Sequence, residues 1–196
     1  MSHHTSKTEN LLALGNYTYQ LLILITFAGI LTAAMTFQYA NGELPCPLCL
    51  LQRVAMFGIC FGIMLDFRRG FSYQNVGFSL LSALFLLIVS VRQTLLDIYP
   101  RAGHVYIGSA VFGIHMPVWS IIITVLLLIA YAVQLCVLGR DTDLPLIPAS
   151  YYPALKRIGE GVSLYVLALL VVNFVSVGLQ CGVGQCHTMG YALLGG

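Results

Sequence analysis

Long stretches without a charged side chain constrain this sequence more than any other feature. Asp, Glu, Lys and Arg are absent from five segments, residues 10–42, 54–65, 70–91, 102–139 and 161–196. Charged residues make up 8% of the chain and hydrophobic residues 59%, whereas a soluble domain has roughly 25% charged residues. So few charges cannot cover the surface of a soluble protein of 196 residues. The pattern therefore predicts an all-α membrane protein with several spans.

The charge-free segments also predict where the chain crosses the bilayer. A transmembrane helix needs about 20 apolar residues, and the segments provide five such spans, at about 19–40, 49–66, 75–97, 117–138 and 160–180. We expect one integral membrane domain over 1–196, with an uncleaved first span, loops at 41–48 and 98–116, and a tail at 181–196. The net charge of +2 forms no basic patch, which argues against nucleic-acid binding.

The distribution of cations predicts the orientation. Cationic residues gather on the cytoplasmic side of membrane proteins. With five spans, the N-terminus and the second and fourth connections share one side, which carries six cations: Lys7, Arg68, Arg69, Arg140, Lys156 and Arg157. The other side carries Arg101, or three cations if the boundary residues Arg53 and Arg92 are included. We therefore expect a cytoplasmic N-terminus and a C-terminus in the oxidising periplasm of a bacterium.

Two cysteine pairs fall on the predicted periplasmic side. Cys46 and Cys49 form a Cys-X-X-Cys motif at the start of the second span, a motif in which the reactive thiolate is favoured. Arg53 follows one helical turn later, on the face of Cys49. A redox-active dithiol is the leading interpretation. The alternatives are a static disulfide and an arginine that only reaches toward the membrane interface.

The second pair, Cys181 and Cys186, lies after the last span in a segment containing two glycines. This loop can close a disulfide, either to exchange with other thiols or to pin the C-terminal tail. We expect His187 to be a solvated loop residue. Cys60 and Cys136 lie within spans, and we expect both to pack as small apolar side chains. Residues 101–116 form either a plain loop or a short interfacial helix that includes Val111 and Phe112.

The stretch Cys46-Pro-Leu-Cys49, followed by Gln52-Arg53, resembles the disulfide-bond formation protein B (DsbB) family of bacterial inner-membrane thiol oxidases. Residues 92–100 and 108–115 also resemble segments of that family, and the likeness covers roughly 19–138. It implies a four-helix transmembrane bundle, here extended by a fifth C-terminal helix. It also implies that electrons pass from a periplasmic thioredoxin-fold dithiol oxidase (DsbA-like) to ubiquinone or menaquinone of the membrane pool.

The resemblance further implies roles for individual residues. Cys49 would face the quinone and Cys46 would exchange disulfides with the donor. Arg53 would hold a quinone oxygen, with Gln52 and Gln93 also at the quinone site. Some relatives carry a histidine where this chain has Gln93, and a glutamine cannot titrate near neutral pH.

One departure from the family leads to a hypothesis. The usual second cysteine pair between the third and fourth spans is missing, because residues 97–117 contain no cysteine. We expect Cys181 and Cys186 to replace it as catalytic residues, taking electrons from the soluble partner and passing them to Cys46 and Cys49.

Two other functions remain open on the sequence. The four cysteines and His187 form a possible thiolate-rich site for binding or transporting a metal. Alternatively, the chain is a structural or assembly subunit with inert disulfides.

Overall fold

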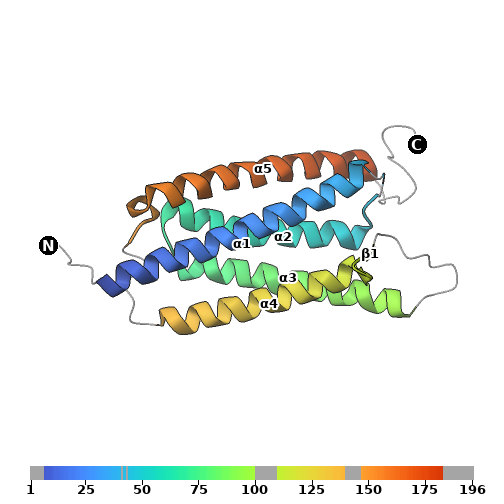
Figure 1. Cartoon of the computed structure of the whole chain (residues 1–196). Helices are drawn as coiled ribbons and strands as arrows, with labels where there is room; N and C mark the ends of the chain where they lie inside the picture. Colours follow the sequence, from blue (N-terminus) through green and yellow to red (C-terminus); the bar gives the residue numbers. More distant parts are fainter. Residues whose placement is uncertain (1–6, 41, 43, 100–109, 140–146, 183–196) are drawn as a thin grey trace.

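The computed structural model describes residues 7–40, 42, 44–99, 110–139 and 147–182. Five long helices form a bundle (Figure 1): α1 (Lys7–Ala40), α2 (Pro47–Arg69), α3 (Tyr73–Ile98), α4 (Met116–Leu138) and α5 (Pro153–Cys181). All five are long and apolar enough to cross a membrane. The chain is thus an all-α, multi-pass membrane protein, as the charge pattern predicts.

Each predicted apolar segment lies within one helix, but α1 and α5 begin well before their predicted spans, at Lys7 and Pro153. Hydropathy marks only the part of a helix that the bilayer can hold, while a helix continues until its backbone conformation changes. Proline in the first turn of α2, α4 and α5 suits a helix start, since its missing N–H has no partner there. Ser72 caps α3 by accepting a hydrogen bond from the backbone nitrogen of Gln74 at 3.2 Å.

Close packing of α2 on α3 forms the centre of the bundle. Gly58 and Gly62, four residues apart, face Ser82 and Ser79 of α3, and a Cβ at Gly62 would lie 2.7 Å from the carbonyl oxygen of Asn75. Small residues at this spacing let helix backbones approach in a membrane, where burying apolar surface does not drive association. Ser79 Oγ uses this approach to donate to the carbonyl oxygen of Ile59 at 3.1 Å.

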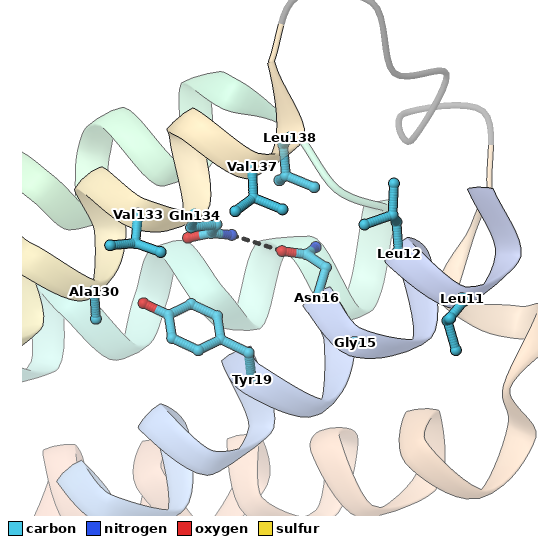
Figure 2. Close-up of a pocket in the computed structure, with 10 residues that line it drawn as sticks. All are labelled: Leu11, Leu12, Gly15, Asn16, Tyr19, Ala130, Val133, Gln134, Val137 and Leu138. Atoms are coloured by element: carbon cyan, nitrogen blue, oxygen red, sulfur yellow. Dashed lines mark hydrogen bonds between the residues drawn. The ribbon is translucent and has the colours of Figure 1, made fainter. Parts of the chain in front are cut away.

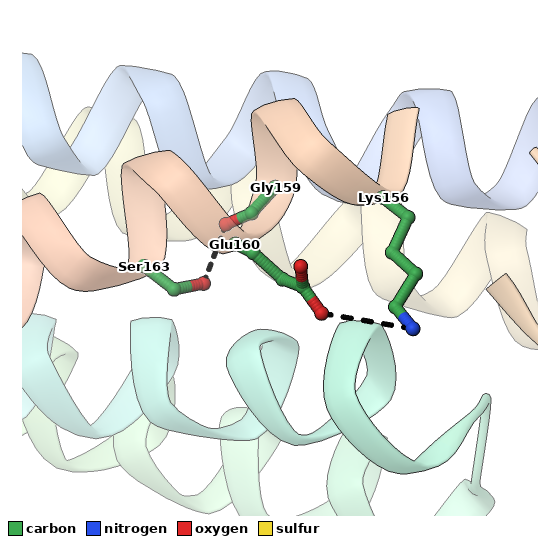
Figure 3. Close-up of polar contacts among 4 residues, drawn as sticks. All are labelled: Lys156, Gly159, Glu160 and Ser163. Carbon is green, nitrogen blue, oxygen red and sulfur yellow. Dashed lines mark hydrogen bonds and ion pairs between the residues drawn. The ribbon is translucent and has the colours of Figure 1, made fainter. Parts of the chain in front are cut away.

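Helix α5 packs along α1 and α2. Gly159 allows the contact near its start, since a Cβ there would lie 2.6 Å from the ring of Phe67 on α2. The same stretch carries an exposed i, i+4 pair on the helix surface, Lys156 Nζ and Glu160 Oε1 at 3.7 Å (Figure 3). Ser163 Oγ donates back to the carbonyl oxygen of Gly159 at 2.6 Å.

A buried carboxylate lies at the end of the bundle where α2 turns into α3. Asp66 is 1% exposed. It accepts hydrogen bonds from Gln20 Nε2 at 2.7 Å, Asn75 Nδ2 at 2.7 Å and the backbone nitrogen of Ser72 at 3.0 Å. These three donors tie α1 and α3 to the end of α2.

The opposite end gathers the segments that carry chemistry. The start of α2, the hairpin before α4 and the end of α5 all lie there (Figure 1). In that hairpin, β1 (Ala110–Val111) pairs with β2 (Ile114–His115), and Phe112 and Gly113 form the turn with positive φ. An interfacial helix through Val111 and Phe112 is therefore wrong. Residues 101–109 lie outside the described part of the chain.

The two cysteines within the spans differ in their surroundings. Cys60 of α2 is fully buried in the core, as predicted. Cys136 of α4 is exposed on the outside of the bundle and lies outside the protein core. Hydropathy alone cannot tell which face of an apolar helix meets protein and which faces outward.

Candidate active site

The Cys-X-X-Cys motif is built into the N-terminus of α2. Cys46 is the N-cap residue, with an extended backbone (φ −70°, ψ 161°), and Pro47 follows as the first helical residue. The sulfur of Cys46 accepts a hydrogen bond from the backbone nitrogen of Cys49 at 3.2 Å. Its carbonyl oxygen accepts from the nitrogen of Leu50 at 3.0 Å. Both sulfurs therefore lie in the first turn of the helix, where the helix dipole favours negative charge.

Cys46 and Cys49 are free, half-buried thiols. Two causes raise the pKa of the Cys46 thiol above its ordinary value. The larger is a side-chain hydrogen bond with Cys49, and the second is burial of the thiol. Cys46 therefore holds its proton while it is hydrogen-bonded to its neighbour. The predicted pairing of the two residues in one helical turn agrees with this geometry.

Two other predicted residues, Gln93 and Gln52, join the motif. Gln93 Nε2 on α3 lies 3.5 Å from the sulfur of Cys46 and 3.4 Å from that of Cys49, and donates to both. Gln52 Nε2, one turn into α2, donates to Gln93 Oε1 at 3.1 Å and to Ser90 Oγ at 3.1 Å. All three polar partners are at least nine-tenths buried. The sulfurs thus face a hydrogen-bonded group of neutral side chains.

Arg53 points in a different direction from these residues. Its Nη1 donates to Gln38 Oε1 at 2.6 Å and to Asn173 Oδ1 at 3.1 Å, and its Nη2 to the carbonyl oxygen of Ala34 at 3.1 Å. The guanidinium is buried, with 7% of the residue exposed. It lies one turn from Cys49, as the spacing predicts, but its donors link α1 and α5.

The C-terminal end of α5 lies against the motif. Gln180 Nε2 donates to the carbonyl oxygen of Pro45 at 3.0 Å. Because Cys181 follows Gln180 and Cys46 follows Pro45, this bond brings the first cysteine of the second pair next to the first pair. Cys181 is buried and disulfide-bonded. Cys186 and His187 lie outside the described residues.

Sequence reasoning missed three polar residues that hold this end together, Gln38, Asn173 and Gln180. Each lies in an apolar helix and is no more than 4% exposed. An uncharged polar side chain in a span that reaches a buried partner is a sign of helix–helix contact. That signal is present in the sequence, although it does not say which helix supplies the partner.

One pocket lies near the other end of the bundle, between the first turns of α1 and the last turns of α4 (Figure 2). Gln134 Nε2 donates there to Asn16 Oδ1 at 2.6 Å, beside Tyr19 and several aliphatic side chains. Within the described residues, His, Cys, Asp and Glu form no group of three that could hold a metal ion.

The chain matches the family model for disulfide bond formation protein DsbB over residues 16–106. "Disulfide bond formation protein B" of Cupriavidus metallidurans is 34% identical over 87 residues, which are 44% of this chain and 54% of that protein. The protein of the same name from Nitrosomonas europaea is 36% identical over 90 residues, covering 42% and 52%. The chain thus spans about half the length of these relatives. No solved structure matches it.

The matched segment contains α2, α3 and most of α1. It includes the two cysteines of the motif, both glutamines that order them, and Arg53. Helix α5, with Asn173 and Gln180, lies outside it. Over residues 16–106, this chain is therefore similar to the disulfide bond formation protein DsbB family.

Proposed function

We propose that this chain is a membrane thiol oxidase that reoxidises a periplasmic thioredoxin-fold dithiol protein and passes the electrons to a membrane quinone. The family match supports a disulfide-forming oxidoreductase. The observation that carries the finer proposal is the hydrogen bond from Gln180 to the carbonyl oxygen of Pro45, because it brings Cys181 close to the first pair.

The exchange sequence follows from this juxtaposition. A thiolate of the soluble dithiol attacks the disulfide of Cys181 and Cys186, which leaves oxidised partner and a reduced C-terminal pair. A thiolate of that pair then attacks the disulfide of Cys46 and Cys49. Two electrons and two protons thereby move to the motif, and the C-terminal disulfide is restored. Each step exchanges one disulfide for another through a mixed disulfide.

Polar contacts along one face of α5 fix the position of its C-terminal end. Tyr165 Oη is 2.8 Å from Thr32 Oγ1 of α1, Asn173 accepts from Arg53, and Ser176 contacts Tyr39. Hydrogen bonds between helices stabilise association in the bilayer. With Gln180, these contacts set the rotation and height of α5, and therefore where Cys181 lies.

The residues at the motif fit a quinone in part. Cys49 is half-buried at the N-terminus of a membrane helix, so its sulfur can meet an apolar molecule that arrives through the bilayer. A quinone supplies the two-electron acceptor, and quinones are expected for DsbB-family members. Arg53, in contrast, already donates to Gln38, Asn173 and Ala34.

The proposed location is the bacterial inner membrane, with the N-terminus in the cytoplasm. Five of the six cations that predict this orientation are described in helices. Lys7 begins α1, Arg68 and Arg69 end α2, and Lys156 and Arg157 lie near the start of α5. These helix ends lie at the end of the bundle away from the start of α2 and the end of α5 (Figure 1).

Quinone reduction by the purified protein tests the proposal. The donor is a reduced thioredoxin-fold dithiol protein, and short-chain ubiquinone and menaquinone are supplied separately. Wild type should reduce at least one of them, and the variant Cys46→Ser/Cys49→Ser should reduce neither.

The relay predicts that Cys181→Ser/Cys186→Ser also loses turnover with the protein donor. It should still reduce quinone when a small dithiol such as dithiothreitol reaches the motif directly. Full activity of this variant with the protein donor would refute the relay. Absence of quinone reduction by wild type with every donor would refute the oxidase itself.

A further inference from the structure

A chain of hydrogen bonds runs from the backbone of α3 to the motif. Ser90 Oγ donates to the carbonyl oxygen of Leu86 at 2.7 Å. Gln52 Nε2 donates to Ser90 Oγ and to Gln93 Oε1, both at 3.1 Å. Ser90 is 0% exposed and the two glutamines are each 7% exposed. Bulk water therefore does not compete with these bonds.

The direction of every bond in this chain follows from its first member. A backbone carbonyl only accepts, so the single proton of Ser90 points to Leu86 and its oxygen can only accept. Gln52 must therefore turn its NH2 group toward Ser90. The second N–H of that group points to Gln93, which must meet it with its only acceptor, Oε1. The amide of Gln93 consequently cannot flip without losing a buried hydrogen bond.

The far side of Gln93 then presents two N–H groups to the two sulfurs. Its Nε2 lies 3.5 Å from Cys46 Sγ and 3.4 Å from Cys49 Sγ. A thiolate is a much better acceptor than a disulfide sulfur, since hydrogen bonds to ionised groups are roughly twice as strong as neutral ones. Two donors in this position stabilise the reduced pair more than the oxidised pair.

We propose that Ser90 and Gln52 act as positioning residues that hold Gln93 as a double N–H donor to Cys46 and Cys49, and that this makes their disulfide a stronger oxidant. Stabilising the reduced form is what raises the potential of a dithiol pair. The donor is a neutral amide, so it donates both hydrogen bonds without gaining or losing a proton. This inference rests on the proposed function only in taking Cys46 and Cys49 as the redox-active pair.

The described side chains that contact the motif from α3 and α5 are uncharged. Gln93 supplies the contacts from α3, and Gln180 supplies the contact from α5. Arg53 is the nearby cation on α2, and its donors point to α1 and α5. Among the described residues, the titratable groups at the motif are Cys46 and Cys49 themselves. A change made at Gln93 therefore alters donors to the sulfurs and leaves the charge of the surrounding contacts unchanged.

The test measures the redox equilibrium of the motif without quinone or protein partner. The full chain carries Cys181→Ser and Cys186→Ser, so that only one pair exchanges, and is equilibrated with mixtures of reduced and oxidised glutathione. Alkylation and mass measurement give the oxidised fraction of Cys46 and Cys49. Replacing Gln93→Met, which keeps the length but removes both donors, should make the disulfide about tenfold harder to reduce. For a two-electron couple this is about 30 mV.

The positioning role has its own variants. Gln52→Met and Ser90→Ala touch neither sulfur, yet both should shift the equilibrium in the same direction by a smaller factor. They should also lower the thiolate ultraviolet absorbance of the reduced pair at neutral pH. Ser82→Ala is the matched control, because Ser82 makes the same bond to the carbonyl four residues earlier but faces Gly58 of α2, away from the motif. It should shift nothing.

An unchanged equilibrium in Gln93→Met, or a shift toward easier reduction, would overturn the donor role. Equal results for Ser90→Ala and Ser82→Ala would overturn the positioning role. Thermal unfolding of each purified variant shows whether it is folded. If Gln93→Met does not fold, the milder change Ser90→Ala carries the test. Since the assay contains no quinone or partner, its failure is separate from a failure of the proposed turnover.

Discussion

Replacing Asn173 by leucine should weaken the attachment of α5 to the bundle. Asn173 Oδ1 accepts from Nη1 of the buried Arg53 at 3.1 Å. A hydrogen bond to a charged group is worth about 1.5–3 kcal/mol in soluble proteins, whereas hydrogen bonds between membrane helices average about 0.6 and reach about 1.7 kcal/mol. Arg53 keeps acceptors at Gln38 and Ala34, so the cation is not left unsatisfied. We therefore expect a loss of about 1 kcal/mol.

The assay is reversible unfolding in mixed micelles, followed with increasing denaturing detergent. A double-mutant cycle with Arg53→Met isolates the pair, because removing Asn173 should cost almost nothing once the guanidinium is gone. Val172→Leu, at an exposed position on the same helix, is the control and should be neutral. The same loss for Asn173→Leu in both backgrounds would show that the two side chains are not coupled, and would refute the proposed role of this contact.

Gly62→Ala should destabilise the protein by about 1–3 kcal/mol, the usual cost of overpacking, because its Cβ would meet the carbonyl oxygen of Asn75. Gly77→Ala, in open space on α3, is the control and should be neutral or slightly stabilising. Equal melting temperatures for the two variants would contradict the close approach of the helices. The reduced Cys46 thiol should ionise at higher pH in the folded protein than in the unfolded chain, because its hydrogen bond with Cys49 and its burial raise its pKa. The pH profile of its alkylation rate, resolved by peptide mass, reports this ionisation. Cys49→Ser should move the profile part of the way back, and identical profiles in folded and unfolded protein would contradict the interaction.

Much of the architecture can be predicted from the sequence because the bilayer imposes it. Charged side chains are costly in hydrocarbon, so their absence marks the spans, and each predicted span lies within an observed helix. An even number of spans between Cys49 and Cys181 predicts that both cysteine pairs share one end. Among the described residues, the end of α5 and the start of α2 do lie together there, joined by the hydrogen bond from Gln180 to Pro45 (Figure 1). The chemistry of Cys-X-X-Cys at a helix start is likewise local, and it needs no knowledge of the neighbouring helices.

The rotation and register of the helices are decided only by the tertiary structure. An apolar helix in a membrane has a weak preference for any one face, so its pattern does not reveal that Cys136 faces outward or that Arg53 turns toward Asn173. Tertiary structure also decides which way the Gln93 amide is turned. Its orientation depends on the hydroxyl proton of a serine in the same helix and on a glutamine from another helix. The sequence determined which side chains can carry redox chemistry and at which end of the bundle they lie. Packing between helices decided which of them touch, because those contacts join residues far apart in the chain.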